Sequence, residues 1–384
     1  MKIIHGHPDF LWWRTVGTMI GGMVGVGVLG LPYAFAQSGW SVGLTMLLVL
    51  GFLLMILNFM YAEVVEQTPG RHRLAGYVQK YLGKIPARFA AVIFAFYAWG
   101  AMLAYILVGG DFLYTLLFPV FGGSLLTYQL AMAAMSSFLT FGGIKKMAKI
   151  ESVIVGVLIF LFAFMILVSF PSLEPRNVLS IHLNNWFVPY GVLFFALSGL
   201  GVIPEMKDVL GSHRRHELPH TILFGQLIII ALYALFALAV VGVTGPLTTE
   251  SAFDGLASVF GRTFAVAGSL LGSITILSIF SVVSIELQDA FRFDYKIPQK
   301  LAWFITVLIP IAFLLFGVSH FVDLISFLGG VFGGIIGILV ALMYRKMRCE
   351  GLCPIHKCLR VPHFVIWLLI AIFVGGIIQT IVNF

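Results

Sequence analysis

Gly27-Val28-Leu29-Gly30-Leu31-Pro32 lies in the first long apolar segment of the chain, and Gly199-Leu200-Gly201-Val202-Ile203-Pro204 lies in the sixth. Each stretch consists of a glycine, four further residues and a proline, and Gly199 follows Gly27 by 172 residues. Glycine tolerates backbone conformations that interrupt a helix, and proline lacks the N–H group that a helix interior requires. The two stretches therefore predict two helices that are broken at corresponding places of an internal repeat.

The composition is that of a membrane protein. Of the 384 residues, 60% are hydrophobic and 10% are charged, whereas soluble domains contain about 25% charged residues. Apolar segments of about twenty residues, which suffice to cross the hydrocarbon core of a bilayer, recur from end to end of the chain. We expect eleven transmembrane helices, at residues 14–37, 41–65, 87–118, 124–142, 149–170, 184–206, 219–243, 263–290, 299–316, 321–344 and 363–382.

The 172-residue offset relates the first five of these segments to the next five. Because five is an odd number, the second repeat must enter the membrane upside down, as in the inverted repeats of secondary transporters. The sequence thus predicts an all-α membrane protein in which helices one and six are unwound at mid-membrane. We expect a single transporter domain over 1–384, with a first repeat at 14–170, a second repeat at 184–344, and a cytoplasmic loop plus the eleventh helix at 345–384.

The basic residues alternate with the predicted spans. If the N-terminus is cytoplasmic, 21 of the 23 lysines and arginines fall on the cytoplasmic side, and Arg176 and Arg262 fall outside. The positive-inside rule therefore predicts a multi-pass protein of the inner or plasma membrane, with a cytoplasmic N-terminus and an extracytoplasmic C-terminus. The net charge of +7 is explained by these loops, and we see no basic stripe typical of nucleic-acid binding.

The three cysteines, Cys349, Cys353 and Cys358, all lie in the predicted loop before the last helix. We expect reduced or lipid-modified thiols there, because this loop faces the cytoplasm. With His356 they leave a zinc site as the alternative, although their spacing is not that of a usual zinc finger. Apart from a coupling ion, we expect no metal and no cofactor.

The stretch from Gly21 to Gly30 contains five glycines. If the helix is unwound here, the free amides near Val26, Gly27 and Val28 would face an anion at the N-terminus of the second half-helix. Glycines in membrane helices also permit close helix packing without any ligand. The following proline and the second copy at 199–204 favour the unwound interpretation.

Three stretches of the sequence resemble a known family. Gly25-Val26-Gly27-Val28-Leu29-Gly30-Leu31-Pro32-Tyr33-Ala34-Phe35-Ala36-Gln37-Ser38-Gly39-Trp40 is similar to the first-helix signature of the amino acid/auxin permease family, in the amino acid-polyamine-organocation superfamily. Gly100-Ala101-Met102-Leu103-Ala104-Tyr105-Ile106 and Ile203-Pro204-Glu205-Met206 resemble its third and sixth helices. The resemblance implies the leucine-transporter fold and amino acid uptake coupled to sodium or protons.

The resemblance also implies a substrate site. Amides of the Gly25–Val28 segment would bind the substrate carboxylate, and carbonyls near Met23 and near Phe195, Ala196 and Ser198 would accept from the substrate ammonium group. Phe195 would form the outer gate, with a packed core aromatic as the alternative. Tyr105 would close the pocket or contact the carboxylate, with a packed tyrosine as the alternative.

An ion site is expected beside the substrate. Hydroxyls of Ser278 and Ser281, with carbonyls near Gly21 and Val24, resemble the superfamily's common sodium site. Serines in membrane helices also donate to their own helix, which is the alternative. For proton coupling, the candidates are Lys149, Asp111 and Glu286.

Two of the candidates for proton coupling, Lys149 and Glu286, have a simpler interpretation. Lys149 lies close enough to the cytoplasmic edge to be a positive-inside anchor. The acids Glu205, Glu286 and Asp289 lie near cytoplasmic helix ends, where Lys207 and Arg292 can pair with them.

The sequence favours a permease for neutral, apolar or aromatic amino acids, with an amino acid, Na⁺ or H⁺ and the lipid bilayer as partners. The alternatives are a transporter of another small solute or of a metal ion on the same fold, a membrane channel and a nutrient sensor. We find no paired catalytic constellation, phosphate loop or nucleophile motif, so an enzyme is not expected.

Overall fold

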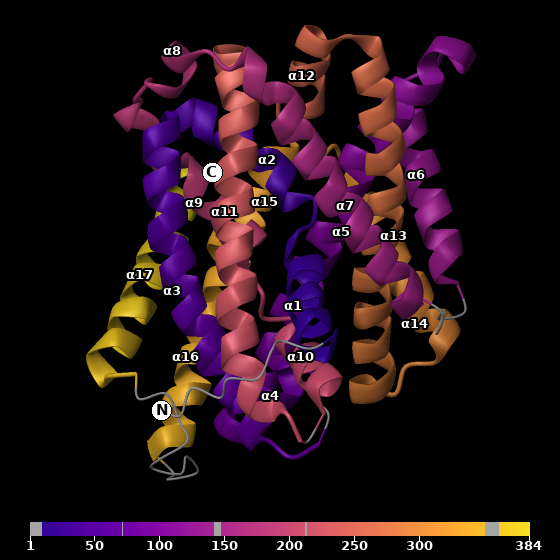
Figure 1. The fold of residues 1–384 in the computed structure, drawn as a ribbon. Coiled ribbons are helices and arrows are strands. Elements are labelled where there is room, and N and C mark those ends of the chain that lie inside the picture. Colours follow the sequence, from indigo (N-terminus) through magenta and orange to yellow (C-terminus); the bar gives the residue numbers. More distant parts are fainter. Residues whose placement is uncertain (1–9, 71, 142–146, 212, 350–360) are drawn as a thin grey trace.

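The computed structural model describes residues 10–70, 72–141, 147–211, 213–349 and 361–384. This part of the chain forms a bundle of long helices, most of which run roughly parallel to one common axis (Figure 1). The main helices are α1 (Phe10–Met23), α2 (Gly27–Ser38), α3 (Trp40–Gln67), α4 (Leu74–Leu82), α5 (Lys84–Phe121), α6 (Leu125–Thr140), α7 (Met147–Ser169), α8 (Pro175–Val178), α9 (Val188–Leu197), α10 (Ile203–Leu210), α11 (Leu218–Thr244), α12 (Phe253–Phe260), α13 (Arg262–Tyr295), α14 (Gln299–Leu315), α15 (Phe321–Phe327), α16 (Gly334–Cys349) and α17 (His363–Asn383).

The helices satisfy the requirements of a membrane protein. Among the described residues, six helices are long and apolar enough to cross a bilayer, or seven if the bent pair α1 and α2 is one span. Four shorter apolar helices overlap the predicted fourth, fifth, sixth and ninth spans, at Leu125–Thr140, Ile159–Ser172, Val188–Leu197 and Gln299–Leu315. The all-helical, multi-span prediction is confirmed, and the count of eleven crossings stays a prediction.

The first break separates α1 from α2, which meet at an angle of 60°. Pro32 does not lie at this break but inside α2. A proline cannot donate to the carbonyl four residues earlier, so Pro32 leaves the carbonyl of Val28 without its usual helical partner. The break itself falls at Val24–Val26, among the glycines.

The second break separates α9 from α10 and covers Ser198–Val202. Pro204 is the second residue of α10, a position at which a helix needs no N–H group. In both motifs the proline lies in the helix that follows the break, whereas Gly199 lies inside the second break and Gly27 is the first residue of α2.

Two short helices mark the opposite ends of the bundle. α4 precedes α5 in the first half of the chain, and α12 precedes α13 in the second half. Figure 1 shows α4 at the bottom of the bundle and α12 at the top. Inverted repeats require this arrangement, while the repeat boundaries at 14–170 and 184–344 stay a prediction.

One end of α9 packs very closely on a π-helical segment, η5, at Leu328–Gly333. A Cβ atom on Gly329 would collide with the carbonyl oxygen of Gly191, and a Cβ atom on Gly191 would collide with Ser326. We call this contact of Gly191 with Gly329 and Ser326 the glycine seam. It brings two backbones together, and Ser326 Oγ and Phe195 Cβ are the nearest side-chain atoms beside them.

Candidate functional site

The two helix breaks pack against each other. A Cβ atom on Gly27 would lie 2.7 Å from Cδ1 of Phe195 and 3.3 Å from Cα of Ala196. A Cβ atom on Gly22 would overlap the side chain of Val202. These glycines therefore allow the first break to lie against the second, as the shared Gly-x4-Pro pattern leads one to expect.

The backbone around the first break is only partly paired. Val24 N donates to Ile20 O over 2.8 Å, and Gly25 N donates to Met23 O over 2.9 Å. Val28 N donates to Gly25 O over 3.4 Å. The predicted anion contact through the Val28 amide thus competes with a long hydrogen bond inside the break.

A residue that the sequence analysis did not single out lies between the breaks. The hydroxyl oxygen of Tyr233, on α11, is 3.0 Å from the carbonyl oxygen of Met23 and 3.0 Å from that of Ala196. Tyr233 is fully buried. A buried tyrosine hydroxyl in a membrane helix is stabilised by a hydrogen-bond partner, which is the signal in the sequence that could have drawn attention to it.

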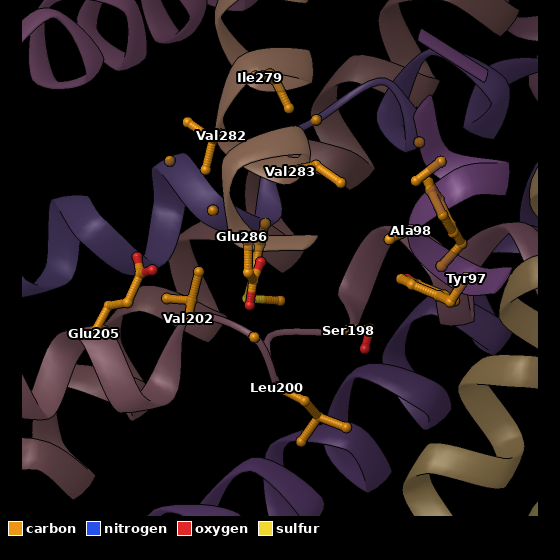
Figure 2. A pocket seen from close by; sticks show the side chains of 18 of the residues that line it. Tyr97, Ala98, Ser198, Leu200, Val202, Glu205, Ile279, Val282, Val283 and Glu286 are labelled. Carbon is orange, nitrogen blue, oxygen red and sulfur yellow. The ribbon is translucent and has the colours of Figure 1, made fainter. Parts of the chain in front are cut away.

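A cavity of about 180 Å³ opens beside the two breaks, between them and helices α5 and α13 (Figure 2). Most of the predicted site residues line it, namely Gly21, Met23, Val24, Gly25, Gly27, Tyr105, Phe195, Ala196, Ser198, Ser278 and Glu286. The structure therefore brings together residues from four separate parts of the chain. This is the candidate substrate site.

The walls of the cavity are largely apolar and aromatic. Ile279, Val282 and Val283 face it from α13, and Tyr97 faces it from α5 (Figure 2). The rings of Tyr97 and Phe195 lie 5.5 Å apart between centroids. Tyr97 is a second residue missed by sequence reasoning, because nothing in its local pattern distinguishes it from a packed aromatic.

The remaining predicted residues lie elsewhere. The side chains of Val26 and Val28 are buried in the core and are not among the residues lining the cavity. The hydroxyl of Ser281 donates to Leu277 O over 2.7 Å, which is the alternative that serines of membrane helices allow. Asp111 lines a different cavity, with Glu250 and His320.

Two groups of expected residues cannot be placed. Lys149 belongs to the first turn of α7, but its side chain lies outside the described part of the structure. Cys353, His356 and Cys358 also lie outside the described residues, and Cys349 is exposed. Both expectations stay predictions.

Charged side chains gather where the cavity reaches α4 and α10. Glu286 extends from α13 toward the segment between Ser198 and Val202 (Figure 2), and a Cβ atom on Gly201 would lie 3.8 Å from its Oε1. Arg73 Nη1 lies 3.4 Å from Glu205 Oε1. Burial lowers the pKa of Arg73, and the carboxylates of Glu286 and Glu205 more than offset this, so its pKa is raised and the guanidinium stays charged.

The ion pairs expected for this region are partly corrected. Asp289 pairs with Arg292 over 3.4 Å, as expected. Glu205 pairs with Arg73 and not with Lys207. The amine of Lys207 instead donates to the carbonyls of Val65 over 2.6 Å and Thr68 over 3.1 Å, because the last carbonyls of α3 have no partner within their own helix.

Comparison with known proteins gives the family. The family model described as "Transmembrane amino acid transporter protein" matches residues 10–382. The chain belongs to this family. The resemblance seen in the first, third and sixth spans is thereby confirmed, and the chain is placed among transporters and not among enzymes.

Curated relatives match shorter stretches. The chain is 35% identical over 60 residues to "Lysine histidine transporter-like 1" of Arabidopsis thaliana, covering 16% of this chain and 13% of that protein. It is 29% identical over 125 residues to "Putative sodium-coupled neutral amino acid transporter 11" of Danio rerio, covering 31% and 27%. The matches thus span less than a third of either relative.

Solved structures share the fold over nearly the whole chain. MhsT in complex with L-phenylalanine superposes with a TM-score of 0.69 at 14% identity, covering 97% of this chain and 98% of that one. The inward-facing conformation of Mhp1 gives 0.68 at 12% identity, covering 97% and 89%. The manganese transporter of Eremococcus coleocola gives 0.68 at 14% identity, covering 99% and 89%. These likenesses show the fold alone.

Proposed function

We propose that this protein is a secondary active transporter that takes up neutral amino acids, with apolar or aromatic side chains, by ion-coupled alternating access. The observation that carries the proposal is the cavity between the two helix breaks. A zwitterion needs hydrogen-bond donors at one end and acceptors at the other, and broken helices supply both from the backbone. The carbonyls of Met23 and Ala196 are the acceptors for the ammonium group. The amides of Val26, Gly27 and Val28 are the donors for the carboxylate, and that of Val28 gives up its 3.4 Å hydrogen bond to Gly25 O.

The walls of the cavity support the choice of substrate class. Tyr97, Phe195 and the aliphatic residues of α13 offer an apolar surface to a side chain. The charged residues among those that line the cavity are Arg73, Glu205 and Glu286. They lie where the cavity reaches α4 and α10, with Arg73 paired to Glu205 and Glu286 facing Gly201. A neutral side chain placed against the apolar wall therefore needs no charged partner there.

The coupling ion has two candidate sites. A sodium ion prefers oxygen ligands, and Ser278 lines the cavity together with Gly21 and Val24, whose carbonyls are the expected backbone ligands. A proton would be carried by Glu286, because an ionisable residue within a membrane span that faces a cavity is a functional candidate. Lys149 stays a third possibility for proton coupling.

Uptake by proteoliposomes tests the proposal. Labelled neutral amino acids are offered with an inward sodium gradient, with an inward proton gradient, and with neither. Saturable accumulation that requires one gradient supports the proposal and identifies the ion. Conductance without saturation in a planar bilayer would indicate a channel, and failure to accumulate any amino acid under either gradient would refute the proposal.

A further inference from the structure

The hydroxyl of Tyr233 contacts both helix breaks at once. It lies 3.0 Å from Met23 O, which is 210 residues away in the sequence, and 3.0 Å from Ala196 O, which is 37 residues away. Because both carbonyl oxygens touch the same hydroxyl oxygen, they are separated by no more than twice that distance. A single group placed on the cavity side is therefore able to reach both.

The Tyr233 hydroxyl cannot donate equally to both carbonyls. A tyrosine hydroxyl carries one hydrogen, so it donates fully to only one carbonyl at a time. Each carbonyl oxygen has two lone pairs. Met23 O also accepts from Gly25 N over 2.9 Å, so it keeps one lone pair for a ligand when the tyrosine hydrogen is directed at Ala196 O, which then keeps its own second lone pair. An ammonium group has three N–H donors, and it satisfies the remaining capacity of both carbonyls.

Tyr233 contacts the two carbonyls from the side opposite the cavity. Met23 and Ala196 line the cavity, whereas Tyr233 is not among the residues lining it and is fully buried. The helix that carries it is fixed nearby, because Gln226, also on α11, accepts a hydrogen bond of 3.0 Å from Asn58 on α3. A ligand in the cavity thus contacts the carbonyls on one side, and the buried hydroxyl of Tyr233 contacts them on the other.

We propose that Tyr233 is a positioning residue that holds the carbonyls of Met23 and Ala196 at the spacing needed to bind the substrate ammonium group. It therefore sets the selectivity for compounds with an α-amino group. The inference rests on the proposed function, because it takes an amino acid as the substrate. Without the hydroxyl, the two breaks lose their common partner, and the spacing of the two carbonyls is no longer fixed.

The test compares Tyr233→Phe with the wild-type protein in proteoliposomes. Uptake of labelled L-phenylalanine, or of the neutral amino acid that the wild type accumulates best, is inhibited with the unlabelled amino acid and with its deaminated acid, 3-phenylpropionate for L-phenylalanine. The ratio of the two inhibition constants measures selectivity for the amino group. Tyr190→Phe is the matched control, because the buried Tyr190 hydroxyl has no hydrogen-bond partner among the described residues.

We expect the ratio to fall about tenfold in Tyr233→Phe, because displaced carbonyls form weaker hydrogen bonds to the charged ammonium group, and to stay unchanged in Tyr190→Phe. An unchanged ratio in Tyr233→Phe, or equal weakening of both compounds, would overturn the inference and leave Tyr233 a structural residue. Ligand-induced shifts in the melting temperature of the purified variant give the same ratio if transport is lost. Failure of the wild type to accumulate any amino acid would instead refute the proposed function.

Discussion

Replacing Gly27 by alanine tests whether the contact between the two breaks shapes the substrate site. The added Cβ atom would lie 2.7 Å from Cδ1 of Phe195, whereas ordinary contacts begin at 3.4 Å. The phenyl ring must therefore retreat by about 0.7 Å, and the ring of Tyr97, 5.5 Å away between centroids, restricts its movement. The Cα atom of Ala196, at 3.3 Å, limits any movement of the backbone in the same direction.

The size of the effect follows from this overlap. Overpacking a close-packed site typically costs about 1–3 kcal/mol. Gly27 is the first residue of α2, so the gain in helix propensity does not offset the cost as it would in a helix interior. If the cost falls on the state that binds substrate, the apparent affinity decreases roughly ten- to a hundredfold.

The KM for amino acid uptake into proteoliposomes measures the effect. Gly17→Ala is the control, because a Cβ atom on Gly17 has nothing within 4 Å among the described residues. A second variant, Gly27→Ala with Phe195→Leu, relieves the overlap and should transport no worse than Phe195→Leu alone. A KM for Gly27→Ala within twofold of the wild type would refute the reasoning, as would a double variant whose two defects simply add.

Three further predictions concern the coupling ion and the contacts of Lys207. Ser278→Ala should raise the sodium concentration for half-maximal uptake about tenfold. Ser281→Ala should raise this concentration less, because the Ser281 hydroxyl already donates to Leu277 O. Equal effects of the two variants in sodium titrations would contradict this. Glu286→Gln should abolish uptake driven by a pH gradient but keep counterflow exchange without a gradient, and retention of gradient-driven uptake would exclude Glu286 as the proton carrier. Lys207→Met should lower the melting temperature by a few degrees, because two carbonyls at the end of α3 lose their donor. Lys80→Met, at an exposed position, should leave the melting temperature unchanged. Equal melting temperatures of the two variants would show that the Lys207 contacts add no stability.

The fold was predictable because its determinants are local. A run of about twenty apolar residues indicates a span wherever it occurs, and the glycines and prolines at 27–32 and 199–204 mark the breaks by their own backbone properties. The second half-helix begins at Gly27, among the residues where the glycine-rich stretch places its N-terminus, and Pro32 lies inside it. Local signals thus located the broken helices, and they did not report the packing of Gly22 and Gly27 against the second break.

The site was predictable only in part. Met23, Phe195 and Glu286 were found because glycine motifs, a family resemblance or a charge in an apolar span single them out. Tyr233 and Arg73 act through partners more than a hundred residues away, Met23 and Glu205, and no local pattern reports such a pairing. Ser281 shows the converse, since its spacing suited an ion ligand and its hydroxyl turns to its own helix.

The glycine seam bears on how one side of the protein opens. Dispersion attraction between closely packed atoms falls steeply, and a gap of about 0.5–1 Å already loses a quarter to a half of it. Where Gly191 meets Gly329 and Ser326, no long side chain can stretch to maintain contact as the backbones part. The attraction across the seam is therefore lost over a very short displacement of the two backbones. This favours two discrete positions of α9, in contact and separated, over a continuous range of positions.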